Sequence, residues 1–302
     1  MTWRIVVITQ RAKLDLRLNT MVVRGATITK IHLGEISTVL VENTEVSFTA
    51  SLLCELMKRK IKVIFCDEKR NPCCETISYY GSHDTSIKLR EQLQWRQEVK
   101  DAVWTEIVAE KIRQQSQVLK DGGHSESALL LRYLQELEPR DATNREGHAA
   151  KVYFNALFGL NFTRSADNIV NAAAHNYVDK AESAALNYGY SILLSAFNRE
   201  IVANGYLTQL GLFHDNMFNY FNLGCDFMEP FRPLVDRVVL NLTGEQFEQA
   251  EKIVMVGVLN QEVIIDGKSH YVNNAIKIYC KSIFEALGNQ DVAQLKFYRN
   301  EL

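Results

Sequence analysis

The sequence lacks the features that would place it among membrane, secreted or zinc-binding proteins. No apolar run reaches the roughly 18 residues of a membrane span. The amino terminus, MTWRIVVITQ, has neither the apolar core nor the cleavage site of a signal peptide, and it predicts a first strand. The six cysteines show no zinc spacing, and the adjacent pair Cys73-Cys74 makes poor disulfide partners. These absences favour a cytoplasmic protein in a reducing compartment.

Proline and net charge are also scarce. The chain has 302 residues, only four prolines and a formal net charge of −2, while 47% of it is hydrophobic. With so little net charge, binding to nucleic acid requires a segregated basic surface. The first 100 residues carry 16 Lys and Arg against 11 Asp and Glu, and the rest of the chain carries 18 against 25.

The hydrophobic period changes near residue 80. Before it, Leu14, Leu16 and Leu18 alternate with polar residues, as in a half-buried strand. The neighbouring β-branched runs follow at the spacing of a meander, and a short helix and a buried strand come after them: RIVVIT, MVVRG, ATITKIHL, STVLVEN, SLLCELMKRK and IKVIFCD. We therefore predict an α+β protein with a small N-terminal β-sheet domain, residues 1–80, and a larger helical domain, residues 86–302.

The second part has the period of helices. Val99, Val103 and Ile107 recur every four residues in a long helix that Gly122-Gly123 ends. Asp266-Gly267 between short apolar flanks predicts one hairpin. The other helices are expected over SESALLLRYLQEL, before Pro139, and near 145–158, 187–204, 226–240, 245–259 and 272–287.

The segment GLFHDNMFNYFNLGCDFMEPFRPLV, residues 211–235, concentrates chemically active side chains. His214 precedes Asp226 and Glu229, which stand three residues apart and so share one face of a helical turn. Pro230 and Pro233 stiffen this turn, since proline cannot continue a regular helical hydrogen-bond ladder. An apolar, stiff segment with two acids and a histidine predicts a site for a hard cation.

A second element, NREGH, opens the helix near 145–158. Asn144 is the expected helix cap, and Glu146 lies in the first turn, where an acid is electrostatically favoured. Glu146 either only caps the helix or joins His214 and Glu229 around a divalent ion. Such a mixed oxygen and nitrogen set suits Mg²⁺ or Mn²⁺, and imidazole favours Mn²⁺. A metal held this way polarises a phosphodiester and lowers the pKa of a bound hydroxyl.

Supporting residues have two interpretations each. Asp226 either binds the metal or orients Glu229 and Arg232, and Arg232 either clamps a carboxylate or contacts a phosphate. His148 points away from Glu146 on a helix and is not chosen as a ligand. The aromatic residues Phe213, Phe218, Tyr220 and Phe221 are expected to be core. The candidates for contacts with DNA are Arg145, Lys151, Arg164, Arg199, Arg232 and Arg237.

Six segments, in order over most of the chain, resemble one family. They are HLGEI, VIFCDEKRNP, YYGSHD, NREGHAAKVYFNALFG, LNYGYSILLSAFNREI and LTQLGLFHDNMFNYFNLGCDFMEPFRPLVD. The sequence resembles the CRISPR-associated integrase, the subunit that inserts new spacers into CRISPR arrays, and it looks closest to the type II-A branch. The resemblance implies that Glu146, His214 and Glu229 are the catalytic metal ligands, with Asp226 at a neighbouring acidic position. About a dozen residues near 174–185 look inserted relative to the family.

The resemblance also implies partners. Family members form homodimers through the β domain, and two such dimers flank a dimer of a small second adaptation subunit. In type II-A systems the effector nuclease and a ring-forming DNA-end protein are further partners. The functional hypothesis is a metal-dependent DNA integrase, in which a 3′-hydroxyl attacks a phosphodiester at a repeat boundary. The alternatives are a branched-DNA nuclease that does not integrate, and a non-catalytic scaffold that binds DNA ends.

Overall fold

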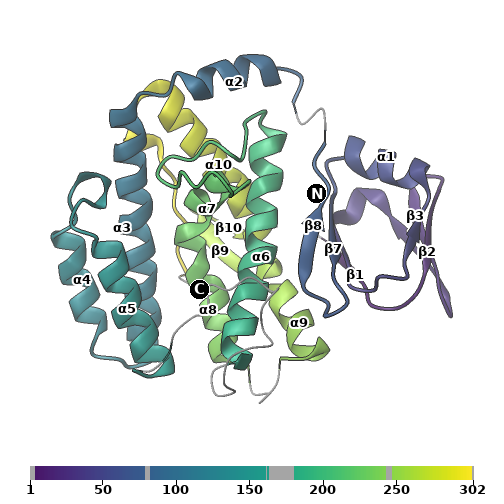
Figure 1. Cartoon of the computed structure of the whole chain (residues 1–302), viewed down its shortest axis with the longest axis horizontal. Coiled ribbons are helices and arrows are strands. Elements are labelled where there is room, and N and C mark those ends of the chain that lie inside the picture. The colour runs from purple at the N-terminus through teal and green to yellow at the C-terminus, as the bar shows by residue number, and fades with distance from the viewer. Residues whose placement is uncertain (1–3, 79–81, 161, 163–179, 243–246, 301–302) are drawn as a thin grey trace. The chain divides into compact units, whose positions relative to one another are not determined.

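The computed structural model describes residues 4–78, 82–160, 162, 180–242 and 247–300 (Figure 1). The chain divides into two compact units. The first comprises Met1–Leu89 with Asn198–Tyr206, and the second comprises Arg90–Phe197 with Leu207–Leu302. N-terminal strands precede a mostly helical remainder, so the predicted α+β class is confirmed. Within the described ranges, no helix combines the length and apolar character needed to cross a membrane.

The first unit contains two four-stranded sheets. In one, with the order β1-β5-β7-β8, the first three strands are parallel and β8 is antiparallel to β7. In the other, with the order β4-β3-β2-β6, strands β2, β3 and β4 form an antiparallel meander and β6 pairs in parallel with β2. The bounds are β1 Arg4–Ile8, β2 Lys13–Arg17, β3 Thr20–Arg24, β4 Ile28–His32, β5 Ile36–Val41, β6 Ser47–Phe48, β7 Lys62–Cys66 and β8 Pro72–Glu75.

The expected meander is therefore wrong for the first and fifth strands. RIVVI and ISTVLV do not follow their sequence neighbours into one sheet but pair in parallel with each other. The reason is burial, because every residue of β5 is buried, as in a central strand covered on both faces. Helix α1, Ala50–Lys58, begins at Thr49, whose side chain accepts from the Leu52 amide, and buries Leu52 and Leu56 in the core of this unit.

The second unit is built around the 25-residue helix α3, Gln97–Asp121. This helix packs against α4, α5, α8 and α10 (Figure 1). Large aromatic side chains fill the core, with the Phe231 ring 4.6 Å from the Tyr298 ring and 5.3 Å from the Phe197 ring. The other helices are α2 Thr85–Leu93, α4 Ser127–Gln135, α5 Arg145–Phe158, α6 Lys180–Ala203, α7 Asn222–Met228, α8 Arg232–Leu240, α9 Gln249–Val256 and α10 Val272–Asn289.

The predicted hairpin in the helical half is confirmed. Strands β9, Glu262–Ile265, and β10, Lys268–Tyr271, pair antiparallel around Asp266 and Gly267. Both turn residues have positive φ, 53° and 72°, as a two-residue type I′ connection requires. The expected domain bounds at residues 80 and 86 stay a prediction, since helix α2 runs across the division between the compact units.

Candidate active site

Three helical elements of the second unit bring two acids onto one lysine. Glu146 lies in the first turn of α5, and Glu229 begins a 3₁₀ turn, Glu229–Phe231, between α7 and α8. The Lys111 ammonium, from α3, is ion-paired with the Glu146 carboxylate and lies 2.5 Å from Oε2 of Glu229. The Arg232 guanidinium holds the other oxygen of Glu229 at 3.0 Å. Glu146 and Glu229, 83 residues apart in sequence, thus share one cation.

Charge in this cluster is balanced, with Lys111 and Glu229 buried and the Glu146 side chain 31% exposed. The side chains of Lys111 and Glu229 are only 8% and 6% exposed. Burial alone would raise the pKa of Glu229, but the Arg232 guanidinium and the Lys111 ammonium outweigh it and bring the pKa to about 2. Burial would lower the pKa of Lys111, and the Glu229 and Glu146 carboxylates raise it instead. Lys111 and Glu229 therefore stay ionised at neutral pH.

His214 is held by Asp226. The Nδ1 atom of the imidazole lies 2.6 Å from Oδ1 of Asp226, which is fully buried at the side chain. The other oxygen of Asp226 accepts from the backbone N–H groups of Leu212, at 2.6 Å, and Phe213, at 3.2 Å. The hydrogen bond with Asp226 raises the pKa of His214 against the opposing effect of burial. Asp226 therefore orients the histidine and its loop, and its roles toward a metal, Glu229 and Arg232 stay predictions.

A tryptophan on α3 fixes the histidine from a second side. The Trp104 ring, 2% exposed, stacks on Phe213 with centroids 4.6 Å apart and an angle of 2° between the planes. It also meets the His214 ring edge-on, with centroids 5.8 Å apart. Trp104 and Lys111 stand seven residues apart, which places them on one face of the helix. The same face of α3 therefore supports both the histidine and the two acids.

Asn144 stands at the N-cap position of α5, as expected, but its side chain does not cap the helix. Asn144 has a left-handed backbone, φ 53°, and its side chain makes no capping hydrogen bond. Asp141 caps the helix instead, with its two carboxylate oxygens accepting from the N–H groups of Arg145, at 2.6 Å, and Glu146, at 3.0 Å. Because another acid satisfies the helix end, the Glu146 side chain is available to Lys111. The interpretation of Glu146 as a mere cap loses its support.

Arg232 packs against a buried polar network of Tyr190, Tyr153 and Asp236 that the sequence did not suggest. Its guanidinium carbon lies 4.7 Å from the centre of the Tyr190 ring, and the Tyr190 hydroxyl donates to Asp236. The Tyr153 hydroxyl donates to the other oxygen of Asp236 at 2.9 Å. Of the two roles open for Arg232, the structure shows the clamp on a carboxylate.

The donor chemistry of the site fits a divalent metal. Across the described ranges, no three His, Cys, Asp or Glu side chains already stand in an arrangement that would hold an ion. Two carboxylates nevertheless converge on a cation, the Lys111 ammonium, which marks the place between them as one that accepts positive charge. A histidine with one ring nitrogen bonded to a carboxylate is the usual outer arrangement of a metal-ligating imidazole. The ligand set Glu146, His214 and Glu229 stays a prediction.

The basic candidates for DNA contact are distributed unevenly. Lys151 is exposed, whereas Arg145 pairs with Glu136 at 3.1 Å and Arg237 pairs with Asp121 at 2.6 Å. Arg164 lies outside the described residues. These assignments stay predictions.

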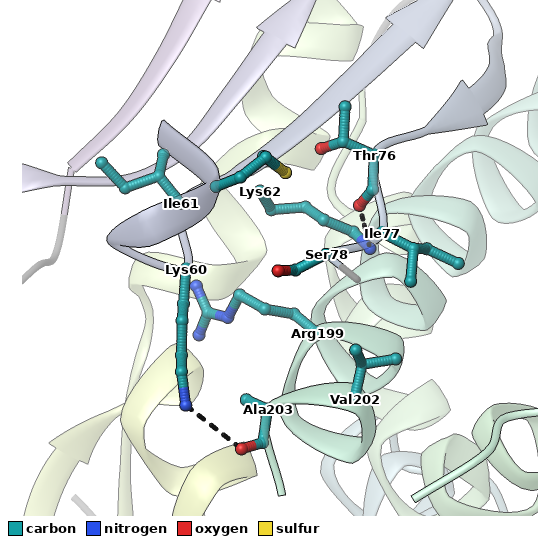
Figure 2. Close-up of a pocket in the computed structure, with 10 residues that line it drawn as sticks. Lys60, Ile61, Lys62, Thr76, Ile77, Ser78, Arg199, Val202 and Ala203 are labelled. Atoms are coloured by element: carbon teal, nitrogen blue, oxygen red, sulfur yellow. Dashed lines mark hydrogen bonds between the residues drawn. The ribbon is translucent and has the colours of Figure 1, made fainter. Parts of the chain in front are cut away.

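Arg199 lies at a small cavity in the first unit. It pairs with Glu200 at 2.8 Å and donates to the Ser37 carbonyl at 3.3 Å. Lys60 and Lys62 line the same cavity and donate to the Ala203 and Thr76 carbonyls (Figure 2). A volume of about 30 Å³ admits water but not a nucleotide. We therefore do not assign this cavity to a substrate.

The expectation that the aromatic residues beside His214 are core is wrong for most of them. Phe218 and Tyr220 are 84% and 71% exposed, and Phe213, although stacked on Trp104, is 41% exposed. The neighbouring Met217 is 86% exposed. Side-chain to backbone hydrogen bonds hold this loop, for example from the Phe218 N–H to Asn216 at 2.9 Å, so its shape does not depend on burying these rings.

The sequence pattern of the family CRISPR associated protein Cas1 matches residues 5–263, most of the chain. The chain belongs to this family. It is 34% identical over 304 residues to the CRISPR-associated endonuclease Cas1 of Neisseria meningitidis serogroup C, covering 98% of this chain and 96% of that protein. A second Cas1 endonuclease, from Francisella tularensis subsp. novicida, is 26% identical over 84% of this chain and 83% of its own. The resemblance to the family is thus confirmed, and the type II-A branch stays a prediction.

Solved structures share the fold. A Cas1 protein from Thermotoga maritima superposes with a TM-score of 0.72 at 18% identity, covering 95% of this chain and 97% of that one. A casposase bound to an integration product superposes with a TM-score of 0.75 at 15% identity, covering 100% and 96%. A chain of a Cas6-RT-Cas1–Cas2 complex matches 99% of this chain with a TM-score of 0.70 at 18% identity, and this chain spans 36% of its length.

Proposed function

We propose that this protein is a metal-dependent DNA integrase of CRISPR adaptation. Its reaction inserts new spacer DNA into the CRISPR array. The observation that carries the proposal is the convergence of Glu146 and Glu229 on a buried cation, beside a histidine fixed by Asp226, in a member of the Cas1 family. The fold shared with a casposase bound to an integration product supports the same class of chemistry.

The proposed step is a direct transesterification. The oxygen of a DNA 3′-hydroxyl forms a bond to the phosphorus of a phosphodiester at a repeat boundary. The bond from that phosphorus to the 3′-oxygen of the repeat strand breaks, and the proton of the attacking hydroxyl leaves as the departing oxygen gains one. One phosphodiester bond is exchanged for another without hydrolysis, and no protein nucleophile is required.

The side chains divide this work. Glu146, Glu229 and the ring nitrogen of His214 that Asp226 leaves open would hold Mg²⁺ or Mn²⁺. When bound, the ion would polarise the phosphodiester and lower the pKa of the attacking hydroxyl. Asp226 keeps the imidazole in one orientation, and Arg232 keeps the Glu229 carboxylate in place.

Hydrolysis is the second candidate, favoured by the name endonuclease that the curated relatives carry. Water would replace the 3′-hydroxyl at the same residues, and branched DNA would be cut without joining. A DNA-end scaffold with no chemistry is the third, and it predicts no metal-dependent strand breakage.

The proposal includes partners. DNA is the substrate, both as the incoming spacer and as the repeat. A small second subunit of the Cas2 type is supported by the complexes in which structurally similar chains occur with Cas2. A homodimer, and in a type II-A system the effector nuclease and a ring-forming DNA-end protein, are expected from the family resemblance alone.

One experiment separates joining from cutting. A labelled DNA fragment is incubated with a repeat-containing plasmid, Mn²⁺ and the protein with its Cas2-type subunit, once with a 3′-hydroxyl and once with a 3′-deoxy end. Integration predicts label joined to plasmid only with the hydroxyl. Hydrolysis predicts nicking that is equal with both ends, and a scaffold predicts neither.

The same assay tests the residues. Glu146→Gln, His214→Ala and Glu229→Gln should each reduce joining by roughly a hundredfold or more, because the ion that would polarise the reacting phosphodiester loses a ligand. DNA binding, measured by fluorescence anisotropy, should change little. Glu285→Gln, an exposed acid on α10 paired with Lys281, is the matched control and should leave joining unchanged. Normal joining by Glu146→Gln would exclude the proposed ligand set.

A further inference from the structure

Lys111 is a charged residue on an apolar face. Its neighbours along α3 include Ile107, Val108 and Ile112, all fully buried, and Lys111 itself is 7% exposed. An ammonium group taken out of water is costly unless it is paired and hydrogen-bonded. Packing alone therefore does not explain a lysine at this position, because an apolar side chain would fill the same space.

The reason is the pair of acids from other elements. Lys111 is ion-paired with both Glu146 and Glu229, whereas the ion pair of Arg232 within the described residues is with Glu229. Two carboxylates that meet at one point repel each other in a low-dielectric site unless a cation separates them. Lys111 is thus the group that allows Glu146 and Glu229 to stay together before any metal arrives.

We propose that Lys111 is the built-in counter-ion of the metal site, occupying the place between Glu146 and Glu229 until a divalent ion displaces its ammonium. The inference rests on the proposed metal site and deepens it. A lysine suits this role because its charge is a single point on a flexible four-carbon stem, which can withdraw without moving the helix. Lys111 then sets the concentration of divalent ion at which the site fills, by competing for the same two carboxylates.

Stability without metal tests the counter-ion role alone. In the presence of chelator, Lys111→Met should lower the melting temperature of the full-length protein, because buried Glu229 and partly buried Glu146 lose their shared partner. Adding Glu146→Gln in the same chain should restore much of the loss, since the repulsion disappears with one of the charges. Equal losses from Lys111→Met with and without Glu146→Gln would show that the lysine does not hold the acids together.

A metal titration tests displacement. Melting temperature is followed against MnCl₂ concentration for the unmodified protein, for Lys111→Met and for Lys252→Met. Lys252 is the matched control, a 6% exposed lysine on α9 that lies over the Tyr188 and Phe247 rings. Lys111→Met should reach half of its Mn²⁺-induced shift at a concentration roughly ten- to a hundredfold lower, the equivalent of losing a competing charge-assisted hydrogen bond. Lys252→Met should keep the unmodified midpoint.

The outcomes separate this inference from the proposed function. An unchanged Mn²⁺ midpoint in Lys111→Met would overturn displacement even if the protein integrates DNA. A lower midpoint without any strand transfer would support the counter-ion role while the proposed function fails. If neither the unmodified protein nor Lys111→Met responds to Mn²⁺, the metal site and the displacement are both wrong. The double variant Lys111→Met with Glu146→Gln, which lacks one ligand, should respond to Mn²⁺ weakly and guards against a shift caused by ions bound elsewhere.

Discussion

Asp236 is a buried acid, and its burial disfavours the ionised form. Burial raises its pKa to about 6, although the hydroxyls of Tyr190 and Tyr153 donate to it and oppose the rise. The folded protein therefore keeps the proton up to about pH 6, while the unfolded chain releases it near the ordinary value of 3.8. The folded state binds more protons between these values, so the free energy of unfolding falls as pH rises through this window.

Asp236→Asn should remove this pH dependence. The unmodified protein is expected to lose on the order of 3 kcal/mol of stability from Asp236 between about pH 4 and pH 6, and no more above it. Urea unfolding at a series of pH values measures the difference between the two proteins. Tyr190→Phe removes a hydroxyl that lowers the pKa, so the fall should move to higher pH. Parallel pH profiles for the unmodified protein and Asp236→Asn would show that Asp236 ionises normally.

Single residues show where sequence reasoning succeeds and where it stops. The sequence pointed to Glu146 and Glu229, and the structure brings both to one cation. It missed Lys111, although a lysine inside the apolar stripe of α3 is a local signal that a buried anion must be near. The partners of that lysine are 35 and 118 residues away, so no local pattern identifies them. Asp141 was missed as the cap because Asn144 stands directly before the helix, and asparagine caps helices about as well as aspartate does.

At the scale of elements, the loop before α7 decides how His214 is presented. Gly211 lies close to both His214 and Asp226, and a Cβ atom on it would lie 2.3 Å from the His214 carbonyl oxygen and 2.7 Å from Oδ2 of Asp226. Neither is the free end of a flexible side chain, because one is backbone and the other already accepts the N–H of Leu212. Any larger residue must therefore move the loop away from Asp226.

Gly211→Ala should reduce DNA joining strongly while costing about 1–3 kcal/mol of stability, the usual effect of overpacking. The control is Gly288→Ala on α10, where the added carbon would meet no atom within 4 Å among the described residues, apart from its chain neighbours and its own helix backbone. Alanine there should raise stability by about 0.5–1 kcal/mol through helix propensity and leave joining unchanged. Joining assays and urea unfolding of both variants make the comparison. Full joining by Gly211→Ala would mean that the contact between the loop and Asp226 does not position the histidine.

Elements were predicted best where the signal is local. The bounds of α5 match the expected 145–158, because a strong helical period and a clear C-terminal glycine mark both ends. The pairing of β1 with β5 was not predicted, since these strands are neighbours in space but separated by a whole meander in sequence. The exposure of Phe218 and Tyr220 was also missed, because an apolar composition indicates burial unless a hydrogen-bonded loop displays the rings instead.

At the scale of the whole molecule, the first unit carries apolar side chains on its outer surface. Leu18 is 97% exposed in the turn between β2 and β3, with a left-handed backbone of φ 44° that branched apolar residues seldom adopt. Ile28 is 62% exposed on β4, an edge strand of its sheet. An unpaired edge with exposed apolar residues is a surface for association. These features support the homodimer expected through this unit.

The double variant Leu18→Asp with Ile28→Asp should convert the dimer to a monomer. Aspartate suits the left-handed turn position better than leucine does, and Ile28 is exposed, so the folded chain itself should lose little stability. Light scattering after gel filtration should give about 69 kDa, twice the 34.5 kDa of the chain, for the unmodified protein and about half of that for the variant. Ile253→Asp, a 50% exposed residue on α9, is the control and should stay dimeric. A variant that remains dimeric would move the interface away from this sheet, and an unmodified protein that is monomeric at micromolar concentration would exclude the homodimer.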